Sequence, residues 1–166
     1  MTQTFALTLL PDRLAICRLP ADAAIPPWAI SALSAGGFGA VTRTRDELSV
    51  VCAQTHIPTA ANAAAANADA ANADADCDDG AHDGASDAGL RVDADWRALR
   101  VEGPFAFTEV GVLATLTTAV ANANIGVFAI STFDTDYLLV KRADADAAIQ
   151  ALSVAGHRVE GDDEQT

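Results

Sequence analysis

The sequence is poor in basic residues, and this scarcity limits what the protein can bind. Its 166 residues include 10 lysines and arginines against 23 aspartates and glutamates, so the formal net charge is −13. Nucleic acids and anionic lipid surfaces are bound through clusters of Lys and Arg, and the sequence has no such cluster. The negative field also repels polyanions. We therefore expect neither nucleic-acid binding nor membrane binding.

Cysteines and long apolar runs are scarce as well. Cys17, Cys52 and Cys77 are odd in number and widely spaced, and they form no C-x-x-C pair. They therefore indicate neither a disulfide framework nor a zinc site. No apolar run approaches the roughly 18 residues of a membrane helix, and the amino terminus lacks the pattern of a secretory signal. These absences predict a cytoplasmic protein without a metal ion or other cofactor.

A low-complexity segment, residues 59–89, separates two more apolar parts of the chain. It is built mainly from Ala, Asn, Asp and Gly, and it has no Lys, Arg, Leu, Ile, Val, Phe, Trp or Tyr. Such a segment cannot bury enough apolar surface to offset its conformational entropy, so we expect a solvated linker. Its Asp74-x-Asp76-x-Asp78 pattern resembles the start of a calcium loop. The glycine and glutamate that such a loop requires are missing, so no metal site is predicted.

The part before the linker, residues 1–58, alternates short strand-forming runs with one helix signal. A Pro-Asp pair at residue 11 separates the first two runs and predicts a β-hairpin. A Pro-Pro pair at residue 26 favours a helix start, and a Gly-Gly pair at residue 36 favours its end. We therefore expect a ββαββ module. Its predicted elements are strands at 4–10 and 13–19, a helix at 28–35, and strands at 38–45 and 48–54.

The part after the linker, residues 90–160, shows helical periodicity twice. Apolar residues at steps of three and four predict a helix that begins near Thr108 and has one buried face, formed by Val110, Leu113, Leu116 and Val120. The other predicted elements are strands at 96–102, 125–132 and 136–141, a helix at 144–155, and an edge strand at 157–160. This order is βαββαβ, a ferredoxin-like repeat. The predicted fold class is α+β: two tandem ferredoxin-like modules, with antiparallel sheets and helices on one face, followed by a tail at 161–166.

Residues 107–140 carry a family resemblance. They read FTEVGVLATLTTAVANANIGVFAISTFDTDYLLV, with Gly-Val-Leu at a predicted helix start, then Asn-Ile, then Ile-Ser-Thr-Phe-x-x-Asp-Tyr. This segment resembles the last ACT module of the CASTOR-type arginine-sensor family and its short bacterial relatives, and it is similar to the regulatory ACT modules of aspartokinases. The resemblance implies two ACT-type modules and a regulatory protein that is not an enzyme. It also implies a free amino acid held at an interface between modules, which a homodimer would provide here.

The resemblance places the ligand contacts in the loop that enters the first helix of this module and in the hairpin after its second strand. The residues at these positions are Glu109, Val110, Gly111, Val112, Thr132, Phe133 and Asp136. A helix N-terminus offers unpaired N–H groups to a carboxylate, and a glycine such as Gly111 lets a ligand approach the backbone closely. Asp136 or Glu109 can accept hydrogen bonds from an ammonium group, and Phe133 can exclude water.

Each of these residues also has an ordinary structural interpretation. Gly111 can serve close helix–sheet packing, Glu109 can favour the helix dipole, Asp136 can be a turn residue, and Phe133 can belong to the core. Two other functions also stay open. The chain can be a dimerisation or docking module that regulates a partner enzyme without binding a ligand. It can also be a small enzyme on a ferredoxin-like scaffold, although no phosphate-holding loop is evident.

Overall fold

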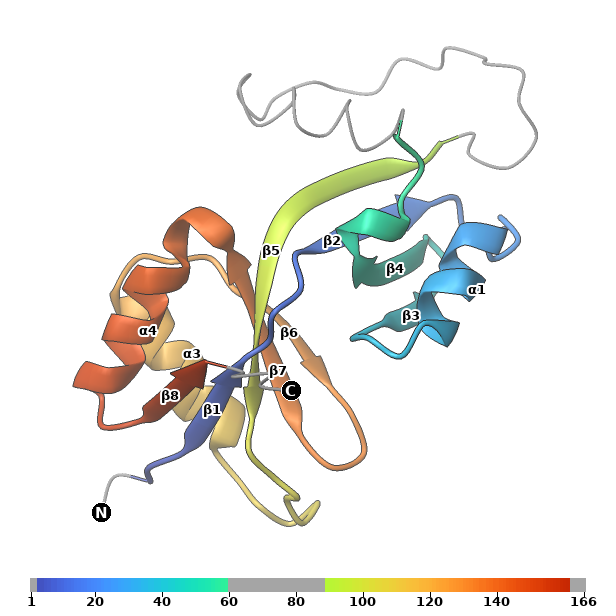
Figure 1. Cartoon of the computed structure of the whole chain (residues 1–166). Helices are drawn as coiled ribbons and strands as arrows, with labels where there is room; N and C mark the ends of the chain where they lie inside the picture. Colours follow the sequence, from blue (N-terminus) through green and yellow to red (C-terminus); the bar gives the residue numbers. More distant parts are fainter. Residues whose placement is uncertain (1–2, 60–88, 162–166) are drawn as a thin grey trace. The chain divides into compact units, whose positions relative to one another are not determined.

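The computed structural model describes residues 3–59 and 89–161 (Figure 1). The chain divides into two compact units: unit 1 combines Met1–Pro11 with Trp96–Thr166, and unit 2 comprises Asp12–Asp95. The predicted linker at 59–89 and the predicted tail at 161–166 lie outside the described residues except for residues 59, 89 and 161. The combination of helices and open antiparallel sheet confirms the predicted α+β class.

Unit 2 is a small antiparallel sheet covered by one short helix. Strand β4 pairs with β2 on one side and β3 on the other, and β2 also neighbours β5, which begins in this unit. The bounds are Leu14–Leu19 for β2, Pro27–Ser34 for α1, Ala40–Arg43 for β3, Leu48–Ala53 for β4 and Gln54–His56 for the 3-10 helix η1. Ala29 and Ala32 of α1 are buried in the same apolar cluster as Cys17 and Cys52. Burial raises the pKa of Cys17 to about 12 and that of Cys52 to about 11, so both are unreactive thiols.

Unit 1 has a five-stranded sheet in the order β6-β7-β5-β1-β8. Strand β8 runs parallel to β1, and the other neighbours are antiparallel. Helices α3 and α4 cover one face of this sheet (Figure 1). The bounds are Ala6–Leu9 for β1, Arg91–Val101 for β5, Val112–Asn122 for α3, Phe128–Ser131 for β6, Asp136–Lys141 for β7, Arg142–Asp144 for the 3-10 helix η2, Ala145–Val154 for α4 and Arg158–Gly161 for β8.

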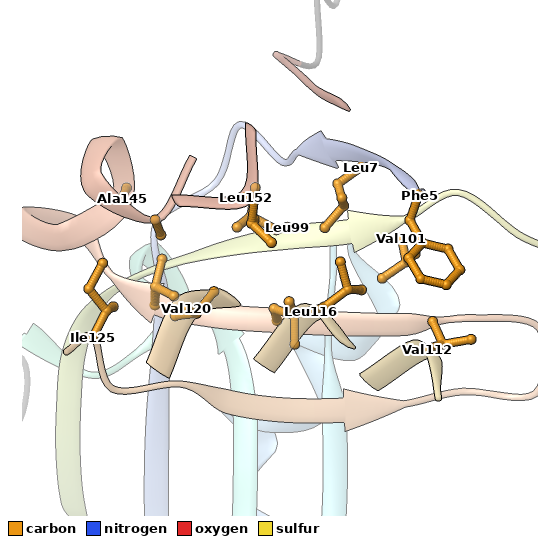
Figure 2. Packing of buried hydrophobic residues seen from close by; sticks show 13 residues of the cluster. Phe5, Leu7, Leu99, Val101, Val112, Leu116, Val120, Ile125, Ala145 and Leu152 are labelled. Atoms are coloured by element: carbon orange, nitrogen blue, oxygen red, sulfur yellow. The ribbon is translucent and has the colours of Figure 1, made fainter. Parts of the chain in front are cut away.

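The core of unit 1 lies between its two helices and the sheet (Figure 2). Leu116 and Val120 of α3 and Leu152 of α4 are fully buried there, against Leu99 of β5 and Leu7 of β1. Each buried leucine contributes about 1.5–3 kcal/mol relative to an exposed one. This packing holds the start of α3 beside the end of β6.

The predicted hairpin between the first two strands is wrong. Strand β1 pairs with β5 and β8 in unit 1, whereas β2 pairs with β4 in unit 2. Between β5 and β8, β1 places Leu7 in the larger core with 1% of its surface exposed. The two strands thus gain more burial from distant partners than from each other.

The predicted start of the first helix after the linker is also wrong. Helix α3 begins at Val112 with Gly111 as its N-cap, so Thr108 is not the cap. Val110 lies before the helix and is 81% exposed, and the buried positions are Val112, Leu116 and Val120. The apolar spacing of three or four residues continues past the helix into the preceding loop. The spacing alone therefore does not locate the first helical residue.

Candidate functional site

A pocket of about 330 Å³ opens on unit 1 between the loop that enters α3 and the β6–β7 hairpin. We call it the hairpin pocket. Its lining residues come from two stretches of sequence, the first ending in the first turn of α3 and the second spanning the hairpin. They are Phe105, Ala106, Phe107, Glu109, Gly111, Val112, Leu113 and Ala114, and Ser131, Thr132, Phe133, Asp134, Thr135 and Asp136.

The structure brings six of the seven predicted site residues together in this pocket. Glu109, Gly111 and Val112 line one side, and Thr132, Phe133 and Asp136 line the other. Val110 is the exception, since it is not among the lining residues. Residues about 20 positions apart in the sequence thus converge because α3 leads the chain back along the sheet to β6.

The N-terminus of α3 opens into the pocket. Gly111 has a φ of +87°, a left-handed conformation that glycine adopts without strain. A Cβ atom at Gly111 would lie 4.0 Å from Thr115 Oγ1, an ordinary van der Waals distance, so close helix–sheet packing does not explain this glycine. No side chain in the described part of the chain caps the helix, and Val112, Leu113 and Ala114 of its first turn line the pocket. This arrangement offers backbone N–H groups and the positive end of the helix dipole to an anionic group.

Three carboxylates line the same pocket, and two of them are held by neutral donors. The Ser131 hydroxyl donates to Asp136 Oδ1 at 2.5 Å, and the Gln3 amide donates to Glu109 Oε1 at 2.8 Å. Asp134 is the third carboxylate, and the lining contains no Lys, Arg or His. The pocket therefore has a net negative charge and suits a ligand group that carries positive charge.

Asp136 and Glu109 lie just outside the turn and the helix that their ordinary interpretations invoke. The tip of the hairpin is closed by Thr132, whose N–H donates to Thr135 O at 2.8 Å, and by the Thr132 hydroxyl, which donates to the same oxygen at 3.0 Å. Asp136 is the first residue of β7, beyond this turn. Glu109 lies two residues before the N-cap, outside the first turn of α3. Both carboxylates lie on the pocket, and that of Asp136 also accepts from Ser131, its partner in the last pair of the β6–β7 ladder, so it ties the two ends of the hairpin.

Two exposed aromatic rings form the rim of the pocket. Phe107 is 80% exposed and Phe133 is 78% exposed, so Phe133 is not a core residue. Their ring centroids lie 5.0 Å apart in an edge-to-face arrangement. Phe133 was predicted from the sequence and Phe107 was not, because their contact joins two loops whose pairing depends on the sheet.

Hydrogen bonds join the β6–β7 hairpin to the end of β5 and to the segment between β5 and α3. The Phe105 N–H donates to Asp134 O at 2.9 Å, and the Thr135 hydroxyl donates to Val101 O. Gly103 lies against the same hairpin, and a Cβ atom there would come within 2.7 Å of Asp134 O. The walls are therefore preformed, and Gly103 allows them to meet.

The lining of the pocket carries acidic side chains and no basic one. It contains no Cys, His or Lys that could act as a nucleophile or a base near neutral pH. Residues 3–59 and 89–161 contain no group of three or more His, Cys, Asp or Glu residues that could hold a metal ion. In the same ranges, no helix has the length and hydropathy to cross a bilayer.

The comparisons with known proteins define the class of this chain as an ACT-domain protein. A family model for the ACT domain matches residues 91–154, and a model for an N-terminal domain matches residues 12–60. The chain is 32% identical to the protein Atu0741 from Agrobacterium tumefaciens, with 99% of this chain and 98% of that chain covered and a TM-score of 0.73. The chain therefore belongs to the same family as Atu0741, and its residues 91–154 match the ACT domain.

More distant solved structures share the fold. The Vibrio cholerae protein VC0802, described as a possible transport protein, matches with 19% identity, a TM-score of 0.58 and coverage of 93% of this chain and 92% of that chain. The regulatory subunit of aspartate kinase from Thermus thermophilus matches with 15% identity, a TM-score of 0.54 and coverage of 93% and 99%. No curated protein matches the sequence.

Proposed function

We propose that this protein binds a free amino acid in the hairpin pocket and acts as a regulatory sensor rather than as an enzyme. The observation that carries the proposal is that the uncapped start of α3 and the carboxylate of Asp136 line one pocket. The first can bind a ligand carboxylate and the second a ligand ammonium group. The ACT-domain match supports the proposal, and so does the fold shared with an aspartate kinase regulatory subunit.

The charge of the pocket favours an amino acid with a cationic side chain. An amino acid with an uncharged side chain supplies one ammonium group, whereas Glu109, Asp134 and Asp136 supply three carboxylates. A second cationic group on the ligand would balance more of this charge. The volume of about 330 Å³ lies at the lower end of the range for small-molecule sites. We therefore propose lysine or arginine as the ligand, in line with a CASTOR-type sensor.

We further propose that the two units are paired ACT-type modules and that a homodimer encloses the ligand. The two outer strands of the unit 1 sheet differ in charge: β8 carries Arg158 and Glu160, paired at 3.1 Å, whereas β6 carries no charged residue. Charges on edge strands prevent unwanted strand pairing, so β6 is the edge that is free to pair. The free thiols Cys17 and Cys52 suit the reducing cytoplasm.

One observation favours the alternative, a docking module that regulates a partner enzyme without a ligand. Phe107, Phe133 and Val110 are each about four-fifths exposed. Exposed apolar groups of this kind mark protein interaction sites. The two functions make opposite predictions for binding of free amino acids.

A ligand screen separates them. Thermal unfolding is measured with each of the twenty amino acids in turn, and the best ligands are then titrated by calorimetry. A ligand at 100 times its dissociation constant adds about 2.7 kcal/mol of stability, which raises the melting temperature measurably. We expect a shift with lysine or arginine. No shift with any amino acid would overturn the sensor proposal and favour docking.

A further inference from the structure

His157 is a buried polar side chain in the core of unit 1. It is 5% exposed and lies between α4 and β8, where its backbone N–H donates to Leu152 O at 3.0 Å. Imidazole is seldom buried without a specific hydrogen-bond arrangement. The surroundings of the ring therefore indicate which protonation state this position requires.

The position requires the neutral imidazole. The Phe5 N–H donates to Nδ1 of His157 at 3.2 Å, so Nδ1 must be unprotonated and the proton lies on Nε2. Nε2 is buried and has no hydrogen-bond partner among residues 3–59 and 89–161. The ring also stacks on Phe5, with centroids 5.7 Å apart and planes 21° apart. A second proton on Nδ1 would oppose the Phe5 N–H and leave a buried charge.

His157 is linked to the hairpin pocket through Phe5. The Phe5 ring meets Phe105 edge-to-face at 6.0 Å, and Phe105 lines the pocket and donates its N–H to Asp134 O. Two residues before Phe5, Gln3 donates to the pocket carboxylate of Glu109. A displacement of Phe5 would therefore disturb the pocket at two points.

The charged groups on the neighbouring elements do not stabilise a protonated His157. Strand β1 and helix α3 carry no titratable residue, and α4 carries only Asp146, in its first turn, at the opposite end from His157. On β8, Arg158 and Glu160 pair with each other in solvent. In the segment before α3, Glu102 accepts from Thr8 and Arg100, and Glu109 accepts from Gln3. Burial accordingly lowers the pKa of His157.

We propose that His157 is a pH-sensitive positioning residue for the hairpin pocket, so that its protonation weakens ligand binding. The inference rests on the proposed amino-acid binding. The neutral imidazole holds Phe5, Phe5 supports Phe105, and Phe105 joins the two walls of the pocket. Protonation releases Phe5, because the acceptor at Nδ1 is lost and the charged ring moves toward solvent. Ligand and proton therefore compete, although the ligand does not touch His157.

The test is a calorimetric titration of the full chain with L-lysine and with L-arginine at pH 7.5 and at pH 5.5. We expect the dissociation constant to rise severalfold at the lower pH; a tenfold rise, reached only below the pKa of His157 in both the free and the bound protein, corresponds to a shift of one unit in that pKa. Ordinary carboxyl groups stay ionised over this window. His157→Asn keeps an acceptor near the position of Nδ1 and does not titrate, so its affinity should be nearly independent of pH. His56→Asn, a matched control in unit 2, should keep the pH profile of the parent.

The outcomes separate the inference from the proposed function. No binding of either amino acid at pH 7.5 would overturn the proposed function and the inference with it. Binding of equal affinity at both pH values, or an unchanged pH profile in His157→Asn, would overturn the inference alone. If His157→Asn does not fold, the His157 ring is titrated by NMR in the parent protein. Saturating lysine or arginine should lower the pKa of His157, and an unchanged pKa would overturn the inference.

Discussion

The exchange of Asp136 for Asn tests the proposed site most directly, because it removes one charge and preserves the shape. Asp136 accepts a hydrogen bond from Ser131 at 2.5 Å, and the amide oxygen of Asn can accept the same bond. The half-buried side chain lies at the start of β7, outside the fully buried core of the unit. The variant should therefore keep its fold and lose only the attraction to a ligand cation.

The size of the effect follows from this geometry. A hydrogen bond to a charged group contributes about 1.5–3 kcal/mol, so the dissociation constant should rise roughly tenfold to 150-fold. Calorimetric titration with the best ligand from the screen measures this change, and urea unfolding measures stability in parallel. Asp146→Asn is the matched control, because it removes the same charge from the exposed first turn of α4, away from the pocket. If Asp136→Asn binds as tightly as the parent, Asp136 does not contact the ligand and the proposed site is wrong.

Three further predictions concern the fold and the support of the pocket. Gly103→Ala should weaken ligand binding at least severalfold in the same titration, because the new Cβ atom would lie 2.7 Å from Asp134 O. An unchanged affinity would show that the two walls of the pocket adapt freely. Leu116→Ala should lower the free energy of unfolding, measured with urea, by about 2–5 kcal/mol. The control Val154→Ala truncates a side chain that is 84% exposed and should change this free energy by less than about 0.5 kcal/mol. Similar losses in the two variants would contradict the assigned core. Replacing residues 59–89 by a short Gly/Ser linker should change the melting temperature in calorimetry by no more than a few degrees, because the segment has no large apolar side chain. A larger loss would show that the segment packs.

Local signals in the sequence determined several elements of unit 1. The helix predicted at 144–155 is observed as Ala145–Val154, and the strand predicted at 136–141 is observed as Asp136–Lys141. These elements depend on apolar periodicity and on nearby stop signals such as Gly156, which has a φ of +95°. The motif at residues 130–137 also identified the hairpin that forms one wall of the pocket.

Only the tertiary structure decided which distant segments meet. The sequence predicted the strand observed at Ala6–Leu9 but not its position between β5 and β8. Strand partners depend on burial in a shared core, which a local pattern does not show. The same reason explains the aromatic pair of Phe107 and Phe133 and the enclosure of His157 against Phe5. A sequence pattern reflects interactions between residues that are close together in the sequence. The pocket and the buried imidazole depend on contacts across more than 20 and more than 150 residues, respectively.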